Sequence, residues 1–240
     1  MTDIYPSYIP CPGKCSVCGF PDMTVLKHLS PSERLVLEKS GTGQRFPRKA
    51  VIFSQGDILQ NVYLIRRGTV KVSIPGRAGK EHIVRLSGVG DLIGYQSVLT
   101  ENISPTTAAA MTETDVCTIS KACFFSLLRS NNTLARRILS MLAREIENTQ
   151  YRMYSLSYKS VRARIAESLL SMARYYGYLA DERTIAGPIY RKDLAEYSGV
   201  TIESTIRCLG EFKKEGLISL ADKHISIRDE KILTSIAQNE

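Results

Sequence analysis

Three of the six cysteines lie within eight residues near the N-terminus, in the order Cys11-x3-Cys15-x2-Cys18. Closely spaced thiolates bind metal, and a tetrahedral zinc or an iron–sulfur cluster takes four such ligands. A fourth thiolate is available at Cys117, in the run TDVCTIS that we expect to form a strand. The candidate metal ligands are therefore Cys11, Cys15, Cys18 and Cys117, holding a [4Fe-4S] or [2Fe-2S] cluster, with zinc as the alternative.

Other interpretations of the cysteines stay open. Two cysteines of the arm could form a redox disulfide, and zinc would make the arm a structural clip. Cys117, like Cys123 and Cys208, is by default a small buried hydrophobic residue. In a reducing compartment, however, clustered cysteines indicate metal or redox chemistry more often than a disulfide framework.

A second group of functional side chains lies in the stretch IYRKDLAEYSGVTIESTIRCLGEFKKEGLI. Its periodicity predicts two helices, 190–197 and 201–214, around the turn Ser198-Gly199-Val200, followed by wing strands at 217–220 and 224–227. This pattern is typical of a winged helix-turn-helix. We expect the two helices to share a core, which contains Leu194, Ala195, Ile202, Ile206, Leu209 and Phe212.

The second helix of this pair directs polar side chains outward near its start. Glu203 and Arg207 are four residues apart and share one face, where Arg can bind guanine and Glu can accept from cytosine; an ordinary surface ion pair is the alternative. The predicted DNA-binding residues are Thr201, Glu203, Ser204, Arg207, Lys192 and Lys213, the lysines (with Lys214) as phosphate contacts. For Arg162 and Arg164, phosphate contact and a solvated surface are equally compatible with the sequence.

The segments that must position these groups form an α+β chain. Residues 1–22 read as an irregular cysteine-rich arm, and Ser30 and Pro31 begin a helical lead-in to a sensor domain at 23–130. Between 44 and 122, short β-prone runs with glycines at their turns predict a β-roll. A dimerisation helix at 131–160 and a DNA-binding domain at 161–240 complete the predicted organisation.

The long helix carries apolar or small residues at steps of four and three. This spacing is the a/d seam of a two-stranded coiled coil and predicts a homodimer, although a helix packed on its own domain is an alternative. The seam contains Ala135, Leu139, Leu142, Ile146, Thr149, Met153 and Leu156.

Taken together, these motifs resemble the CRP/FNR family of bacterial transcription regulators over essentially the whole chain. The resemblance rests on GDLIG at 90–94, the long helix and the helix-turn-helix stretch. It implies a cyclic-nucleotide-binding-like β-roll and a palindromic site on double-stranded DNA, with Glu203 and Arg207 reading a G·C-containing core. A third reader of the family falls at Ile206. Contact with RNA polymerase is also implied, and the hairpin 75–80 is a candidate surface for it.

The FNR branch of the family resembles this chain in CPGKCSVC and VCTI, and it senses oxygen through a [4Fe-4S] cluster. The resemblance therefore implies a [4Fe-4S] sensor of oxygen, or of nitric oxide. The chain departs from the branch at 19–26, GFPDMTVL, which lacks the usual further cysteine, so that Cys11 would substitute.

Other effectors and functions are weighed against the same residues. The segment GYQSVLTENISPTTAAAM contains no Lys or Arg and has Tyr95 where the family's ribose-binding Glu would lie, which argues against a cyclic nucleotide. A small apolar effector or a partner in the roll, and a constitutive regulator, remain alternatives. None of the three histidines is a compelling haem ligand.

The bulk composition agrees with a nucleic-acid partner. The formal charge is +8 with a pI near 9.2, which favours encounter with phosphates. No run of about 18 apolar residues and no signal peptide is present, so we expect a cytoplasmic protein without a membrane partner. No phosphate loop, catalytic triad or paired His/Glu metal motif appears, so we expect no enzymatic activity.

Overall fold

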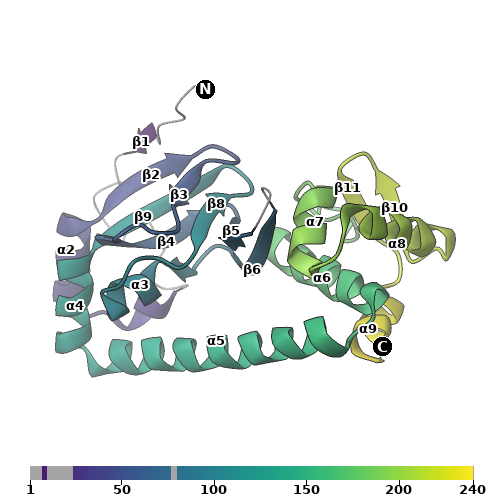
Figure 1. The fold of residues 1–240 in the computed structure, drawn as a ribbon. Helices are drawn as coiled ribbons and strands as arrows, with labels where there is room; N and C mark the ends of the chain where they lie inside the picture. The colour runs from purple at the N-terminus through teal and green to yellow at the C-terminus, as the bar shows by residue number, and fades with distance from the viewer. Residues whose placement is uncertain (1–6, 10–23, 77–79, 240) are drawn as a thin grey trace. The chain divides into compact units, whose positions relative to one another are not determined.

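The protein is described here by a computed structural model covering residues 7–9, 24–76 and 80–239 (Figure 1). Its contacts divide the chain into two compact units. The first contains residues up to 74 and 87–147, and the second contains 75–86 and 148–240. Within the described ranges, no helix is both long enough and apolar enough to span a membrane.

The predicted β-roll is confirmed as two antiparallel sheets. One sheet has the strand order β1-β2-β9-β4-β7, and the other has the order β3-β8-β5-β6. The strands are β1 Ser7–Ile9, β2 Thr42–Phe46, β3 Val51–Phe53, β4 Asn61–Arg67, β5 Val70–Pro75, β6 Glu81–Ser87, β7 Leu92–Ile93, β8 Thr107–Ala110 and β9 Thr114–Ser120.

Strand β1 corrects one expectation, because residues 7–9 are not irregular but pair with β2. The pattern of the arm is too short and too rich in Pro and Gly to indicate a strand. Its backbone partners are supplied by the edge of the roll, which is a tertiary feature.

The turns of the roll use glycine where the backbone requires it. Gly56, Gly68, Gly90 and Gly94 all have positive φ, as their positions between β-prone runs predict. At Gly68 an added Cβ would lie 2.4 Å from the carbonyl oxygen of Glu113, so a side chain there would displace the neighbouring backbone.

Short helices frame the roll: η2 Val25–His28, α2 Pro31–Ser40, α3 Tyr95–Thr100 and α4 Lys121–Ser130. The predicted start of α2 is confirmed. Ser30 accepts from the Glu33 N–H, and the Glu33 carboxylate accepts from the Ser30 N–H, a reciprocal capping box. Helices α3 and α4 lie in segments whose short patterns did not predict them.

The long helix α5 spans Asn132–Tyr158. The Asn131 side chain accepts from the Leu134 N–H at 2.8 Å, so Asn131 is the N-cap, one of the two residues considered from the sequence. Leu134 and Ile138 are buried at the start of this helix, on a face distinct from the a/d residue Leu139, which is 63% exposed.

The second unit contains the predicted winged helix-turn-helix. Its elements are α6 Val161–Tyr176, α7 Arg191–Ser198, α8 Ile202–Lys214, β10 Ile218–Ala221, β11 His224–Ile227 and α9 Glu230–Asn239. Leu169, Leu194, Phe212 and Ile225 form its core with at most 1% exposure. The strands β10 and β11 pair antiparallel as the wing, and α9 is an additional helix that the sequence analysis did not predict.

Candidate nucleic-acid interface and cysteine site

The turn between α7 and α8 is shaped by Gly199. Gly199 has φ +65°, a left-handed conformation that ends α7, and its N–H donates to the Ala195 carbonyl. A Cβ at this position would lie 2.6 Å from Cδ2 of Leu156. The turn therefore favours glycine both by its backbone angle and by its contact with Leu156.

Arg164 holds the same turn from outside. Its guanidinium donates to the carbonyl of Gly199 at 3.1 Å and to that of Ser198 at 3.4 Å. From the sequence, Arg164 could either contact a phosphate or lie on a solvated surface. In the structure it has a third role, which is to hold the turn between α7 and α8 by hydrogen bonds. No sequence signal marks that role, because its acceptors are backbone carbonyls brought close only by folding.

Arg162, for which the sequence also allowed two roles, forms ion pairs with acidic neighbours. It donates to the Glu215 carboxylate, with one N–O distance of 2.9 Å, and lies 4.7 Å from the ring centroid of Phe212. These contacts fix the end of α8 against α6. In the structure Arg162 therefore stabilises the packing of α8 on α6, and its guanidinium binds Glu215 in place of a phosphate.

The outward face of α8 exposes the pair predicted to read bases. Glu203 and Arg207 are both exposed and lie four residues apart. Backbone hydrogen bonding to Glu203, and then the Thr201 hydroxyl, lower the pKa of the Glu203 carboxyl, so that it is ionised at neutral pH. An anionic acceptor and a cationic donor are thus presented on one face.

Thr201 and Ser204, also predicted to contact DNA, are joined to each other. The Thr201 side chain accepts from the Ser204 N–H at 3.1 Å, and the two hydroxyls are 3.2 Å apart. Thr201 is therefore the N-cap of α8. The pair sets the start of the helix at the edge of the reading face.

The shared core of α7 and α8 differs from the prediction in two residues. Leu194, Ala195, Leu209 and Phe212 are buried as expected, whereas Ile202 and Ile206 are 42% and 55% exposed. The buried stripe of α8 runs through Thr205, Cys208, Leu209 and Phe212, so that Thr205 takes the inward position expected for Ile206. The prediction that Ile202 and Ile206 belong to the core was wrong. It relied on their hydrophobic side chains and not on their positions on the helix, which lie outside the buried face.

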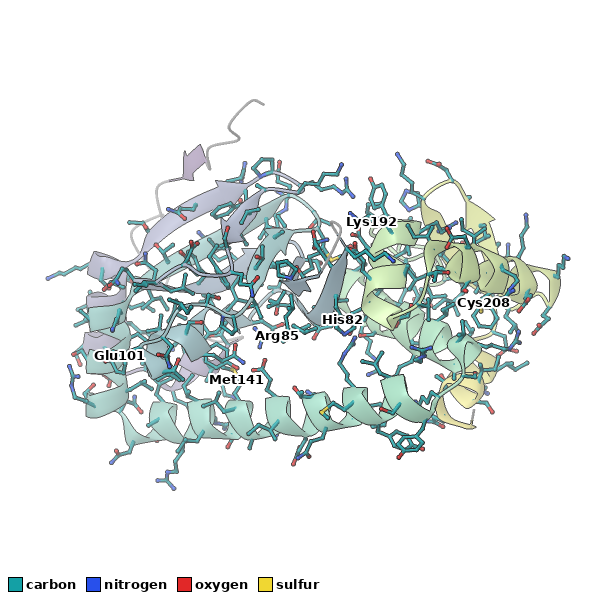
Figure 2. The ribbon with its side chains drawn as sticks, viewed as in Figure 1. His82, Arg85, Glu101, Met141, Lys192 and Cys208 are labelled. Carbon is teal, nitrogen blue, oxygen red and sulfur yellow. The ribbon has the colours of Figure 1, made fainter. Side chains whose placement is uncertain are left out.

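Basic side chains flank the reading face. Lys192, labelled in Figure 2, has 57% of its side chain exposed and lies 3.5 Å from the carboxylate of Glu196 on the next turn. Lys213 and Lys214 are exposed in the last turn of α8. Their exposure is compatible with the phosphate contacts that the sequence predicts for Lys192 and Lys213.

A buried lysine that the sequence analysis missed locks the corner between α5 and α6. Lys159 is 8% exposed, and its Nζ donates to the Tyr151 hydroxyl at 2.6 Å, the Ala237 carbonyl at 2.6 Å and the Glu167 carboxylate at 3.1 Å. Ser155 donates to the same carboxylate at 2.8 Å. The partners come from three helices, α5, α6 and α9, so local sequence could not reveal the cluster.

Cys117 lies in the middle of β9 and is 8% exposed. It pairs with Gly43 of β2 on one side and with Leu64 of β4 on the other. A Cβ at Gly41 would lie 3.2 Å from the Cys117 Sγ and 2.9 Å from the Leu37 carbonyl oxygen. Gly41 and Gly43 thus add no side chain beside the thiol, and its Sγ lies 3.9 Å from the carbonyl oxygen of Thr118.

The three arm cysteines, Cys11, Cys15 and Cys18, lie outside the described residues. Among the residues that are described, no three His, Cys, Asp or Glu side chains gather in a metal-binding group. Burial raises the pKa of Cys208 to about 11, which makes its thiol unreactive in the core of the DNA-binding unit (Figure 2).

Tyr95 occupies the roll position that the family resemblance assigns to a ribose-binding Glu. Its side chain has no exposed surface, and its hydroxyl donates to the carboxylate of Glu145 on α5. The space is therefore filled by an aromatic ring that is hydrogen-bonded to the long helix. This geometry agrees with the argument against a cyclic nucleotide at this position.

Comparison with known proteins agrees with this architecture. The family profile of the cyclic nucleotide-binding domain matches residues 43–131, and that of the Crp-like helix-turn-helix domain matches residues 163–236, together more than half of the chain. The first match describes the fold of the roll. The second covers α7, α8 and the wing.

Individual relatives extend the similarity along the chain. The anaerobic regulatory protein of Haemophilus influenzae is 29% identical over 91% of this chain and 86% of that protein. The fumarate nitrate reduction regulatory protein of Klebsiella oxytoca is 28% identical over 78% of this chain and 74% of that protein. FixK2 from Bradyrhizobium japonicum shares the fold, with a TM-score of 0.74 at 23% identity over 83% of this chain and 98% of that one. With its β-roll, long helix and exposed recognition helix, the chain belongs to the CRP/FNR family of DNA-binding transcriptional regulators.

Proposed function

We propose that this regulator binds a palindromic DNA site as a homodimer and senses oxygen, or nitric oxide, through an iron–sulfur cluster. The proposed ligands are Cys11, Cys15, Cys18 and Cys117. One observation carries the sensing proposal: Ile9, Gly43 and Cys117 lie in one row of register across β1, β2 and β9. The chain that leads into the arm cysteines thus enters the sheet that contains Cys117.

The homodimer is supported by the two faces of α5. Leu134 and Ile138 are buried, whereas the a/d residues Leu139, Ile146 and Met153 are 63%, 59% and 65% exposed. Apolar side chains at alternating steps of four and three, left exposed by the chain's own packing, favour a second copy of the same helix. Leu156, 37% exposed, also lies against the Gly199 turn and links this seam to the DNA-binding unit.

The surroundings of Cys117 fit a cluster ligand. Its donor is a thiolate sulfur when ionised, as such clusters require, and the neighbouring Gly41 and Gly43 have no Cβ atom beside it. A cluster needs further cysteine ligands besides Cys117. The arm is the only other part of the chain with clustered thiols.

When bound, a [4Fe-4S] cluster would supply the redox chemistry that responds to oxygen or nitric oxide. The cysteines would tie the arm to β9, and β9 is joined through β4 to β7 in the same sheet. Tyr95 follows β7 and donates to Glu145 of α5. Cys117 is therefore connected to the helix that we assign to the dimer by strand pairing from β9 to β7, by the short chain segment from β7 to Tyr95, and by the hydrogen bond from Tyr95 to Glu145.

Anaerobic purification tests this proposal. We expect brown wild-type protein with stoichiometric iron and acid-labile sulfide, bleached by brief exposure to air with a loss of DNA affinity. Cys117→Ala should lose the cluster. Cys123→Ala is the matched control, since it removes another buried free cysteine of the same unit and should keep it.

Two results would overturn the sensing proposal. Colourless protein with stoichiometric zinc would make the arm a structural clip, and an intact cluster in Cys117→Ala would remove Cys117 from the ligand set. Neither result would contradict the proposal that the protein binds DNA as a homodimer. The contact with RNA polymerase implied by the resemblance stays a prediction, since residues 77–79 of the candidate hairpin are not described.

A further inference from the structure

The reading face of α8 carries a second, apolar stripe. Ile202 and Ile206 are four residues apart and therefore lie one above the other on the helix. Glu203 and Arg207 follow them by one residue each, about 100° further around the helix. The exposed surface thus presents two parallel stripes, one apolar and one charged.

The apolar stripe is not needed by the core. Cys208, Leu209 and Phe212 are at most 4% exposed and fill the space against α6 and α7, while Ile202 and Ile206 remain 42% and 55% exposed. Exposed apolar area is unfavourable in water by about 25 cal/mol per Å², so a contact that covers these side chains is stabilising. We therefore expect the two isoleucines to contact a partner surface that has apolar groups.

The basic side chains of the same helix-turn-helix favour DNA as that partner. Arg207 lies on the adjacent stripe, Lys192 has 57% of its side chain exposed, and Lys213 and Lys214 are exposed at the end of the same helix. An apolar protein groove would not require these exposed cationic side chains. In the major groove the apolar group available to a protein is the C5-methyl group of thymine.

We infer that Ile202 and Ile206 read thymine methyl groups beside the base pair bound by Glu203 and Arg207, an assignment that rests on the DNA-binding part of the proposed function. Two stripes about 100° apart on a helix 10–12 Å wide are separated by roughly 8 Å, which corresponds to about two or three base pairs. The thymine lies within that distance of the G·C pair. These isoleucines would thus recognise a base by contact with its methyl group, whereas a polar third reader would recognise it by a hydrogen bond.

Replacement of single thymines by deoxyuridine tests the assignment, because it removes the methyl group and keeps every hydrogen-bonding group. A preferred duplex is first selected from random sequence with the full-length protein purified under nitrogen. Each thymine of one half-site is then replaced in turn. We expect wild-type affinity to fall about threefold to fivefold at one or two positions near the G·C pair, as for loss of one buried methyl group.

Variants assign that loss to the two isoleucines. The double variant Ile202→Ser/Ile206→Ser should bind the thymine and deoxyuridine duplexes equally, while still preferring the G·C pair over its replacements. Ile232→Ser is the matched control, since Ile232 is 47% exposed on α9 and should keep the full wild-type discrimination. Circular dichroism verifies that each variant is folded.

The outcomes separate this inference from the proposed function. Wild-type protein that binds the selected duplex but tolerates deoxyuridine at every position would overturn it, as would full discrimination in the double variant. Failure to select any duplex would instead count against specific DNA binding itself. The inference is supported only when discrimination is present in the wild type and Ile232→Ser and lost in the double variant.

Discussion

The hydroxyl of Tyr95, a side chain with no exposed surface, donates a hydrogen bond to the carboxylate of Glu145 in the long helix. This bond joins the segment that follows β7 to α5. Hydrogen bonds to charged groups contribute about 1.5–3 kcal/mol to stability. The pair is therefore the contact through which we expect the roll to act on α5.

Tyr95→Phe tests this coupling, because it removes the donor and keeps the ring. We expect the ratio of DNA affinities between the anaerobic and air-exposed protein to move toward one, with the iron and sulfide content unchanged. Fluorescence anisotropy on a selected duplex measures both affinities. An unchanged ratio would assign the coupling to other contacts between the roll and α5.

Ile146→Glu tests the dimer seam. Placing carboxylates opposite each other at an a position should convert the protein to a monomer and lower the affinity for a palindrome, with little effect on a single half-site. Sedimentation velocity measures the mass. Ser140→Glu adds the same charge at an exposed position of α5 off the seam, and it should remain dimeric.

Gly199→Ala tests the turn of the helix-turn-helix. A side chain would be placed at φ +65° and against Leu156, and we expect the free energy of unfolding to fall by more than about 2 kcal/mol. Gly210→Ala is the control within α8, because its Cβ would meet nothing within 4 Å. This second variant should gain about 0.5–1 kcal/mol, as expected for alanine in a helix interior. Urea unfolding compares the two, and a similar loss in both would refute the role of the turn.

Arg207→Ala and Lys192→Ala should weaken DNA binding in different ways. Loss of Arg207 is expected to cost about tenfold to a hundredfold at the preferred duplex and to relax the choice of base at one position. Loss of Lys192 should weaken binding to all sequences equally and lower the slope of log affinity against log salt by about one. Titrations at several salt concentrations distinguish the two, and identical behaviour would contradict the division into base and phosphate contacts.

Lys159 predicts a loss of stability at alkaline pH. Burial by itself lowers the pKa of Lys159, but hydrogen bonds to Tyr151 and Glu167 outweigh it and raise the pKa above its ordinary 10.5. The stabilisation by the ammonium is therefore complete below pH 10.5 and is lost as pH rises through the higher pKa of the folded state.

The difference in unfolding free energy between wild type and Lys159→Met isolates this contribution. We expect about 1–3 kcal/mol at pH 8, because the variant leaves the Ala237 carbonyl and the Glu167 carboxylate without the ammonium. The difference should shrink above pH 10.5. A difference that stays constant up to pH 11.5 would show that the charge of Lys159 does not stabilise the corner.

Local sequence determined the elements whose signals are self-contained. Ser30 and Glu33 cap α2 by contacts within one turn, and Gly199 marks the turn between α7 and α8 because glycine adopts its left-handed backbone angle without the strain of a side chain. The a/d steps of α5 depend on helical periodicity alone. The exposed pair Glu203 and Arg207 of α8 follows from the same helical periodicity.

Tertiary structure decided whatever depends on partners distant in the chain. Ile202 and Ile206 have the hydrophobicity of core residues, but Thr205 takes the inward position and leaves both exposed. Arg164 and Lys159 bind carbonyls that folding brings to them. Pairing of β1 with β2 requires the open edge of a sheet that forms from residues 42 to 120, so only the folded roll could align Ile9 with Cys117 through Gly43.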